Sequence, residues 1–518
     1  MPRPKRSVAW GIALPALLLG AWFAGPSAQS TPERGVRSIA SESGLPGIDR
    51  GLREHEPVRE PRGGARAEPG AASDADLPYV PGQLIVKFRD GGFATVRSQV
   101  ADVVGAEDMR RPTWANFEVI TIDPAADVEA VASSLEARDD VEYAQPAYKV
   151  YPRFRPNDPL YDRQWNFPAI GMEEAWAINR GATSSVVVAV IDSGLAYRNV
   201  VLEYTFPSFT EGGRTYPALG RRAVPFAAAP ELGGPDRFVA PRDFIWEDQT
   251  PVDLDGHGTH VAGTIGQLTN NGVGVAGMAF NVRLMPIKVL RDRWDQILNA
   301  PNFATDATVA RGIRYAADNG AQVINMSLGR DGAPAPVVAD AVRYAVSRGV
   351  FVAISGGNDF ERGNPVEQIA AIAAEVDGAM SVAAVGRDLS RAYYSSTGSY
   401  IEIAAPGGNI RAGGSTSGIL QQTLDLDLAL TYTSPVAQFA PPRFDSFAYY
   451  YFQGTSMAAP HVAGLAALLM SQGITSPAAI EAAIKRFATD VGPPGRDDEY
   501  GHGLINPRAT LRGLGLVK

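Results

Sequence analysis

The feature that most constrains the fold is a series of short, unbroken apolar runs rich in β-branched residues. They cover residues 186–191, 284–290, 323–328, 350–354, 380–385 and 401–404. Amphipathic helix patterns at 308–319 and 337–348 lie between some of these runs. Runs that are apolar on both faces of a strand and alternate with helices predict a doubly wound, mostly parallel α/β sheet flanked by helices. In such a sheet, ligands bind at the carboxyl ends of the strands.

Three further stretches belong to the same region. An apolar run at 457–470 predicts a buried helix. Two long segments, 198–248 and 410–452, interrupt the strand–helix alternation and contain no repeat. We expect both segments to be surface loop insertions.

A smaller domain is predicted ahead of this sheet, at residues 80–150. Strand patterns at 84–88, 117–122 and 141–148 enclose helix patterns at 93–104 and 128–137. This order in so short a segment predicts a small α+β domain of the split type. The boundary with the larger domain, 151–518, falls in a segment without a hydrophobic period.

The N-terminal segment has the pattern of an export signal. Arg3, Lys5 and Arg6 precede an apolar stretch at 8–24 and a small-residue cleavage site at 26–28. We predict a signal peptide at 1–28, since the apolar stretch is short for the alternative, an uncut membrane anchor. Residues 29–79 have no hydrophobic period and predict a disordered linker. The mature protein is therefore expected to be secreted, extracellular or periplasmic, and free of the membrane after signal cleavage.

Composition excludes several classes of protein. The net charge of -9 comes with no long basic stripe, so a nucleic-acid partner is not expected. The chain contains no cysteine, which excludes a thiol nucleophile, disulfides and cysteine-ligated zinc. We expect a monomer.

Three short motifs carry side chains suited to catalysis. Asp192 ends the first apolar run in VIDSG, His257 stands in DGHGTHVAG at a helix start, and Ser456 stands in GTSMAAPH at the start of the apolar helix. Two of these motifs also have a purely structural explanation. Asp192 could be a strand-end residue that caps a loop, and Ser456 could be an N-cap residue without chemistry. An aspartic peptidase would need a second Asp-Ser/Thr-Gly, and zinc at His257 and His260 would need a third ligand; the sequence supplies neither.

The combination of the three motifs is more specific than any one of them. All three are predicted at the same end of the sheet, in the order Asp, His, Ser that a subtilisin has. A helix N-terminus leaves backbone N–H groups free and partly positive, which favours an oxyanion beside Ser456. The set therefore predicts nucleophilic catalysis by a serine.

Five segments resemble the signature segments of subtilisin-like (S8) serine peptidases. They are VAVIDSG, DGHGTHVAGTIG, INMSLG, SGGN and GTSMAAPHVAGLAALL, and the resemblance covers about residues 157–511. Residues 81–148 resemble, more weakly, the inhibitory (I9-like) propeptide of that family. The resemblance implies a secreted serine endopeptidase that is made as a self-processing zymogen. Its partners would be protein or peptide substrates and its own propeptide.

The resemblance also implies a role for each site residue. Ser456 would be the nucleophile, His257 the base, Asp192 the residue that orients the base, and Asn358 the side chain that holds the oxyanion. The edges that pair with substrate backbone would be formed by Ser327, Leu328, Gly329, Ile354, Ser355, Gly356 and Gly357. His260 and His461 match packed positions without chemistry. The segment between Asn358 and Val385 departs from the family pattern, which leaves the side-chain preference of the enzyme open.

A calcium site is implied by the same resemblance. Asn157-Asp158 and the loop 268–275 are similar to the two segments that hold calcium in the family. The ligands would be the side chains of Asp158 and Asn271 and the carbonyls of Leu268, Val273 and Val275. The alternative is an ordinary turn in which Asn270-Asn271-Gly272 is chosen for its backbone angles.

Two rival functions are weaker. An α/β-hydrolase esterase could use Asp490 and His502 after Ser456, but too little chain follows Ser456 and no HGGG-type loop precedes it. A binding module with the same fold would be expected to have lost at least one catalytic position. All four positions are intact.

Overall fold

The computed structural model describes residues 37–38, 79–89, 93–150, 153–430 and 436–513. They divide into two units, the described parts of 57–152 and those of 1–56 with 153–518. The predicted signal peptide lies outside the described residues, as does most of the predicted linker. Within the described ranges, no helix is both long and apolar enough to cross a bilayer.

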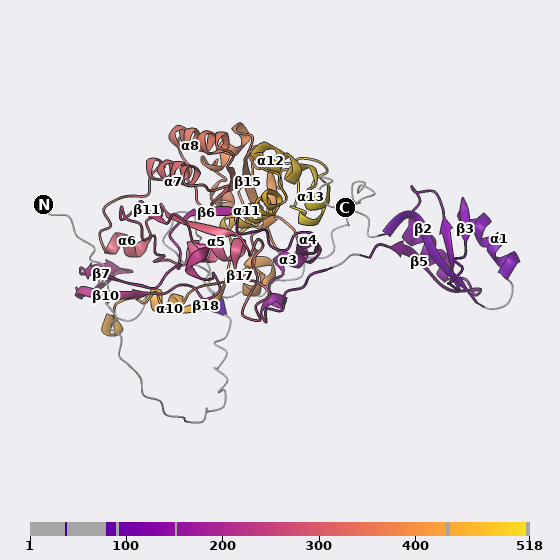
Figure 1. Cartoon of the computed structure of the whole chain (residues 1–518), viewed down its shortest axis with the longest axis horizontal. Coiled ribbons are helices and arrows are strands. Elements are labelled where there is room, and N and C mark those ends of the chain that lie inside the picture. The colour runs from indigo at the N-terminus through magenta and orange to yellow at the C-terminus, as the bar shows by residue number, and fades with distance from the viewer. Residues whose placement is uncertain (1–36, 39–78, 90–92, 151–152, 431–435, 514–518) are drawn as a thin grey trace, which may run out of the picture. The chain divides into compact units, whose positions relative to one another are not determined.

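The smaller unit is a four-stranded antiparallel sheet with two helices (Figure 1). Its elements are β2 (Tyr79–Phe88), α1 (Phe93–Val104), β3 (Asp108–Arg110), β4 (Glu118–Thr121), α2 (Val128–Glu136) and β5 (Val141–Tyr148). The strand order is β3-β4-β2-β5, and Leu84, Ile120 and Leu135 lie in the core. The predicted α+β domain is confirmed, with β3 as an addition. That strand is only three residues long and has no apolar run to reveal it.

The larger unit is built on a seven-stranded sheet in which every pair of neighbours is parallel. The strand order is β11-β12-β6-β13-β14-β15-β16. The strands are β6 (Val187–Asp192), β11 (Arg242–Asp243), β12 (Arg283–Lys288), β13 (Val323–Met326), β14 (Phe351–Ser355), β15 (Ala379–Val385) and β16 (Ile403–Pro406). Every predicted run forms one of them, which confirms the doubly wound sheet.

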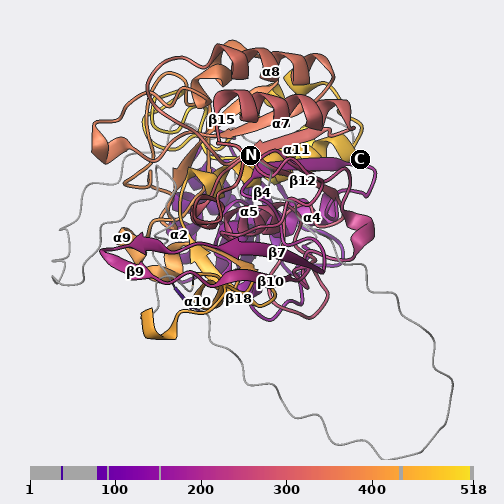
Figure 2. The same cartoon turned by 90° about the vertical axis from the view of Figure 1, so that its left-hand side faces the viewer.

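Helices cover both faces of this sheet (Figure 2). α7 (Asp306–Asp318) and α8 (Pro336–Ser347) pack on one face, and α5 (His257–Gly266) and α11 (Thr455–Ser471) on the other. Almost every residue of α11 is buried, because the helix lies between the sheet and α5. This position explains why its sequence is apolar all round. Smaller helices complete the unit: α3 (Asn166–Ala169), α4 (Met172–Ile178), α6 (Arg293–Ile297), α12 (Pro477–Arg486) and α13 (Pro507–Gly513).

Strand β6 is the point where the chain changes direction across the sheet. It pairs with β12 on one side and β13 on the other, so successive strands depart in opposite directions from it. In open α/β sheets, binding sites form at such a switch point, outside the carboxyl ends of the strands. Asp192 is the last residue of β6 and pairs in register with Lys288.

The two predicted loop insertions are not loops, and that prediction was wrong. Residues 198–248 contain β7 (Val200–Phe206), β8 (Phe209–Glu211), β9 (Arg214–Tyr216) and β10 (Gly220–Phe226). Residues 410–452 contain α9 (Ile410–Gly413), β17 (Ile419–Leu424), α10 (Leu426–Ala429) and β18 (Phe447–Phe452). All six residues of β17 are buried, and the side-chain NH₂ groups of its glutamines donate to Ala276 O and Glu231 Oε1. A buried strand with polar residues does not form the apolar run on which the prediction depended.

One strand lies in the range predicted as a linker. β1 (Arg37–Ser38) pairs in parallel with Tyr450 and Tyr451 of β18. Strand pairing uses backbone groups, so it needs no hydrophobic period in the sequence.

Candidate active site

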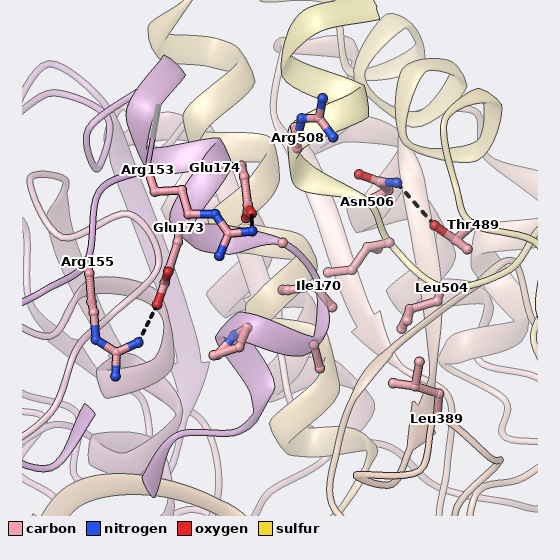
Figure 3. A pocket seen from close by; sticks show the side chains of 14 residues that line it. Arg153, Arg155, Ile170, Glu173, Glu174, Leu389, Thr489, Leu504, Asn506 and Arg508 are labelled. Carbon is pink, nitrogen blue, oxygen red and sulfur yellow. Dashed lines mark hydrogen bonds and ion pairs between the residues drawn. The ribbon is translucent and has the colours of Figure 1, made fainter. Parts of the chain in front are cut away.

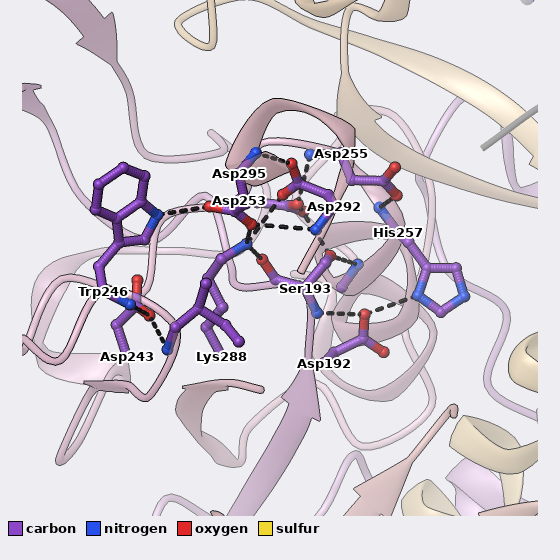
Figure 4. Close-up of polar contacts among 12 residues, drawn as sticks. Asp192, Ser193, Asp243, Trp246, Asp253, Asp255, His257, Lys288, Asp292 and Asp295 are labelled. Carbon is purple, nitrogen blue, oxygen red and sulfur yellow. Dashed lines mark hydrogen bonds and ion pairs between the residues drawn. The ribbon is translucent and has the colours of Figure 1, made fainter. Parts of the chain in front are cut away.

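Asp192 and His257 meet at the carboxyl end of β6. Asp192 Oδ1 lies 2.7 Å from Nδ1 of His257, and both side chains are buried. Gly256 precedes the helix with φ +98°, a conformation that favours glycine, and this turn sets His257 as the first residue of α5. The contact leaves the Nε2 side of the imidazole directed away from Asp192 (Figure 4).

A hydrogen-bond network holds the turn that follows Asp192. Ser193 Oγ donates to Asp253 Oδ1 at 3.0 Å and accepts from Gly258 N at 2.9 Å. Asp253 Oδ2 accepts from both the backbone N–H and the hydroxyl of Thr259. Because Ser193 and Thr259 flank the Asp192–His257 pair, this network fixes β6 against α5. The motif analysis did not identify Asp253, although DLDGHG shows an acidic residue close to the histidine.

A buried lysine lies on the other side of this turn. Lys288 Nζ donates to the Ser193 carbonyl at 2.6 Å and forms ion pairs with Asp292 and Asp295 at 3.0 and 2.7 Å. Burial opposes the charge, but the two carboxylates outweigh it and raise the pKa of Lys288 above its usual value. Asp295 also accepts from Trp246 Nε1 at 2.5 Å (Figure 4). The cluster is therefore a buried, ion-paired support for the turn that follows Asp192.

The surroundings of His257 favour its charged form. Burial alone would lower the pKa of the imidazole, but the negative charges of Asp192, Asp255 and Asp253 raise it to about 9. Asp255 also accepts a hydrogen bond from His257 N at 3.2 Å. Burial, with Asp253 nearby, raises the pKa of Asp255 to about 6.

Ser456 is the second residue of α11 and is partly exposed. Its hydroxyl donates to the Ser327 carbonyl at 3.4 Å, and its own carbonyl accepts from Ser327 Oγ at 2.7 Å. Ser456 and His257 line the same cavity of about 290 Å³. Among the described residues, no hydrogen bond joins the Ser456 hydroxyl to the imidazole.

The amide of Asn358 lies beside Ser456. Its Oδ1 accepts from the backbone N–H of Thr455 at 2.9 Å and from the Thr455 hydroxyl at 3.0 Å. Because the oxygen is held in this way, the NH₂ group is the part of the amide that is left to donate into the cavity. The motif analysis did not identify Thr455, the residue that sets this orientation.

Two chain segments form walls of the cavity. Ser327, Leu328, Gly329, Ser355 and Gly357 line it, as predicted, and Ser355 Oγ joins the walls by donating to Leu328 O. The predicted Ile354 and Gly356 do not line it. Ile354 is fully buried, and Gly356 packs against Ile401 and Val382. The cavity is also lined by residues that the motif analysis missed: Leu290, Arg330, Asp331, Asp359, Arg362, Pro365, Glu367 and Thr455.

The other histidines in the described part of the chain do not line the cavity beside Ser456. His260 stacks on Phe452 at 4.3 Å between ring centroids, and burial lowers its pKa to about 3. His461 contacts Asn166 and the Met457 carbonyl, and burial lowers its pKa to about 4. Both are packed, as predicted. His502, which the esterase alternative requires, is exposed and does not line the cavity beside Ser456.

A larger cavity, of about 450 Å³, lies elsewhere in the same unit (Figure 3). Its acidic and basic side chains pair with one another: Arg153 with Glu174 at 2.9 Å, and Arg155 with Glu173 at 2.9 Å. Its lining includes no histidine and no serine. Size therefore does not identify the candidate site here, and the smaller cavity is the one that His257 and Ser456 line.

The loop predicted to bind calcium is filled with hydrogen-bond donors. Asp158 accepts from Asn270 N at 2.7 Å and Asn271 N at 3.0 Å, and Asn271 Oδ1 accepts from Val273 N at 2.9 Å. A second carboxylate that the sequence did not reveal, Glu231, is buried at the same loop.

Glu231 is likewise surrounded by donors. It accepts from Val275 N, from Gln422 Nε2 and from the hydroxyl of Tyr449. Calcium requires a shell of six to eight oxygens that face the ion. The carboxylates of Asp158 and Glu231 accept from protein donors instead, and the described residues include no cluster of three acidic or histidine ligands. The arrangement favours the alternative, a hydrogen-bonded turn.

Comparison with known proteins agrees with this geometry. The model of the Subtilase family matches residues 183–503, and that of the Fervidolysin N-terminal prodomain matches residues 65–147. The chain is 31% identical to the thermophilic serine proteinase of Bacillus sp. (strain AK1) over 431 residues, which is 82% of this chain and 86% of the relative. It is 31% identical to thermitase of Thermoactinomyces vulgaris over 343 residues, or 66% of this chain and 94% of the relative.

A further relative and a solved structure extend the comparison. The chain is 30% identical to an extracellular protease of Xanthomonas campestris pv. campestris, covering 83% of this chain and 70% of the relative. A solved protease from Pseudoalteromonas arctica matches with a TM-score of 0.51 and 28% identity, covering 69% of this chain and 99% of that one. The chain thus belongs to the subtilase family, as a serine endopeptidase that carries an N-terminal prodomain.

Proposed function

We propose that Asp192, His257 and Ser456 are the catalytic triad of this endopeptidase. The observation that carries the proposal is the 2.7 Å contact between Asp192 and His257 at the edge of the cavity that Ser456 lines. The contact holds the imidazole in one orientation, with Nε2 available to the cavity. In the first turn of α11, the N–H groups of Thr455 and Met457 have acceptors, so the backbone N–H of Ser456 is the donor left beside the serine hydroxyl.

The mechanism follows from these positions. Ser456 Oγ turns from the Ser327 carbonyl towards the imidazole and attacks the scissile carbonyl carbon while His257 Nε2 takes its proton. Catalytic hydrogen bonds of this kind are often absent before substrate binds. The imidazolium is stabilised by Asp192 and then gives the proton to the leaving amine. A water molecule completes the second half of the reaction by the same proton transfers.

The negative charge of the tetrahedral intermediate would be held by two donors. They are the Asn358 NH₂ group and the backbone N–H of Ser456, which both exist before substrate binds and need little reorganisation. Extended substrate would pair its backbone with 327–329 on one side and with the segment of Ser355 and Gly357 on the other, since these residues line the cavity.

The N-terminal part of the chain would act before the mature enzyme exists. We infer that domain 80–150 assists folding and then inhibits the peptidase, until the enzyme cuts its own chain between 148 and 157. The match of the Fervidolysin prodomain to residues 65–147 supports this role. Relatives named as extracellular proteases support export by the signal peptide to the extracellular space or the periplasm. The enzyme would act as a monomer on protein or peptide substrates.

The test is Ser456→Ala in the full precursor, with Ser471→Ala at the far end of α11 as the matched control. We expect Ser456→Ala to lower hydrolysis of casein and of a fluorogenic peptide by several orders of magnitude and to leave the precursor uncut. It should also lose mass labelling by phenylmethanesulfonyl fluoride. Ser471→Ala should mature and hydrolyse both substrates. Near wild-type turnover by Ser456→Ala would refute the triad.

A further inference from the structure

Glu367 lies in the wall of the cavity beside Ser456. Its side chain is 6% exposed, and it lines the cavity together with Gly329 and Gly357. A Cβ atom placed on Gly329 would come within 2.4 Å of Glu367 Oε1, and one placed on Gly357 within 3.1 Å of its Cβ and Cγ. The carboxylate therefore lies between the two substrate-binding walls, in space that two glycines leave open.

The carboxylate is held in place by backbone groups and not by a cation. Oε2 accepts from Ile369 N at 3.0 Å and Ala370 N at 2.9 Å, and Oε1 accepts from Arg330 N. Among the described residues, no lysine, arginine or histidine side chain forms an ion pair with Glu367. Its position is thus fixed, and the Arg330 guanidinium, which favours the charged form of Glu367, forms its ion pair with Asp306 and not with Glu367.

The basic side chains of the cavity are committed elsewhere. The Arg330 guanidinium pairs with Asp306 at 2.5 Å, and Arg362 pairs with Asp359 at 3.0 Å. When these two pairs and the His257–Asp192 pair are set aside, Glu367 and Asp331 are the charged side chains that remain in the lining. Burial raises the pKa of Glu367 to about 7, so the side chain is ionised in alkaline solution. A buried charge that forms no ion pair is costly, and a cationic ligand in the cavity would offset that cost.

From this geometry we propose that Glu367 makes the enzyme selective for peptide bonds that follow a lysine or arginine. The proposal rests on the proposed function, because it places the side chain that precedes the scissile bond in the cavity beside Ser456. The ammonium or guanidinium group would approach the carboxylate between Gly329 and Gly357. Its aliphatic stem would lie along the two walls. Glu367 is a specificity-determining residue in this proposal and takes no part in the proton transfers.

A purely structural role for Glu367 predicts a different outcome. The side chain precedes the 3₁₀ helix Ala370–Glu375 and accepts from the N–H groups at its start, which would stabilise the helix even without a ligand. In that case a substitution would affect cationic and neutral substrates equally. Substrate pairs that differ only by a charge separate the two roles.

The experiment uses the mature enzyme at pH 8.5 with fluorogenic tetrapeptides that differ only before the cleaved bond: lysine, arginine, norleucine or glutamate. Norleucine has the stem of lysine without the ammonium group. We expect kcat/KM for lysine and arginine to exceed that for norleucine by about tenfold or more, and glutamate to be the poorest. A wild-type enzyme that prefers norleucine to lysine would overturn the proposal.

The test variant is Glu367→Gln. The matched control is Glu375→Gln, at the exposed end of the 3₁₀ helix Ala370–Glu375. Glu367→Gln should lower kcat/KM for the lysine peptide about a hundredfold, and it should change kcat/KM for the norleucine peptide by less than about threefold. Equal losses on both substrates would overturn the proposal in favour of the structural role. Glu375→Gln should keep the wild-type ratio.

Two further measurements distinguish a wrong proposal from an unstable variant and from a failure of the proposed function. If Glu367→Gln melts early or does not mature, inhibition of the wild-type enzyme by peptide aldehydes ending in arginine or norleucine replaces it. Tighter binding of the arginine aldehyde supports the proposal, and tighter binding of the norleucine aldehyde refutes it. Failure of the proposed function is distinct, because then no peptide is cut and Ser456 is not labelled by phenylmethanesulfonyl fluoride.

Discussion

His257 and His260 lie one turn apart on α5 and are both buried, yet their surroundings shift the pKa values of the two imidazoles in opposite directions. Three carboxylates near His257 raise its pKa to about 9, whereas burial beside Phe452 lowers the pKa of His260 to about 3. Burial acts on both rings in the same sense, against the charged form. The difference therefore comes from the neighbours, and the carboxyl end of β6 is where this fold gathers them.

The largest expected effect comes from removing the main neighbour of His257. Asp192→Asn should lower kcat about 10⁴-fold, because the imidazole loses the group that fixes its tautomer and stabilises its charged form. The His257 pKa, measured by NMR on its ring protons, should fall towards that of a buried neutral histidine. Asp236→Asn, on the exposed surface, is the control. An unchanged kcat in Asp192→Asn would contradict the inference that Asp192 orients His257 and stabilises its charged form.

The pH dependence of the wild-type enzyme should show the raised pKa directly. His257 must be neutral to accept a proton, so kcat/KM should rise about tenfold per pH unit below about pH 9 and level off above it. The profile is measured on a neutral peptide, so that ionisation of the substrate does not contribute. A plateau that begins near pH 6.5 would mean that the carboxylates do not act on His257 as inferred.

Asp255→Asn should sharpen the comparison by removing one negative charge and keeping an oxygen that can accept from His257 N. The apparent pKa of the kcat/KM profile should fall by about half a unit, since one of several contributing charges is lost. The maximum of kcat/KM should change little. A profile that does not move would assign the whole shift to Asp192.

The neutral histidines should make the fold sensitive to acid. His260 and His461 resist protonation in the native state but charge freely when unfolded, so the free energy of unfolding should fall as pH falls below about 6.5. Each ring can contribute up to about 1.4 kcal/mol per pH unit until its native pKa is reached.

Urea unfolding of the Ser456→Ala protein between pH 7 and pH 4.5 measures this slope without self-digestion. His260→Phe retains a ring beside Phe452 and should reduce the slope, while His502→Gln, at an exposed position, should reduce it less. Equal slopes in the wild-type and His260→Phe backgrounds would show that His260 is protonated in the folded state.

The smallest effect is expected from a chelator. Because donors surround Asp158 and Glu231, the Tm of the mature Ser456→Ala protein should be nearly the same in millimolar calcium and in excess chelator. A large fall in Tm on chelation would show that the loop 268–275 rearranges to bind the ion, because a ligand of the native state stabilises by mass action.

The parts of the fold that could be predicted are those with a strong local signal. Unbroken β-branched runs such as 186–191 identified the parallel strands, because a strand buried on both faces has no polar position. The motifs predicted a site from three distant segments, and the structure brings Asp192 to His257 and lines one cavity with His257 and Ser456. Each of these residues stands next to an element boundary that the sequence marks, at a strand end or a helix start.

The parts that could not be predicted depend on contacts between distant segments. Strand β17 is buried although two of its six residues are glutamines, because their partners are Ala276 and Glu231, far away in sequence. Glu367 stands in the stretch that departs from the family pattern, and only the approach of Gly329 and Gly357 reveals where its carboxylate lies. Local patterns carry no information on such pairings.

The two hydrogen bonds from Thr455 to Asn358 have a consequence for how this enzyme can evolve. They couple the residue before the nucleophile to the side chain proposed to hold the oxyanion, across 97 positions of sequence. A mutation of Thr455 that removes the hydroxyl would release one side of the amide without touching substrate. Most residues at position 455 would keep the backbone bond, so threonine adds the second bond that a designer who transplants Asn358 would need to retain the same orientation.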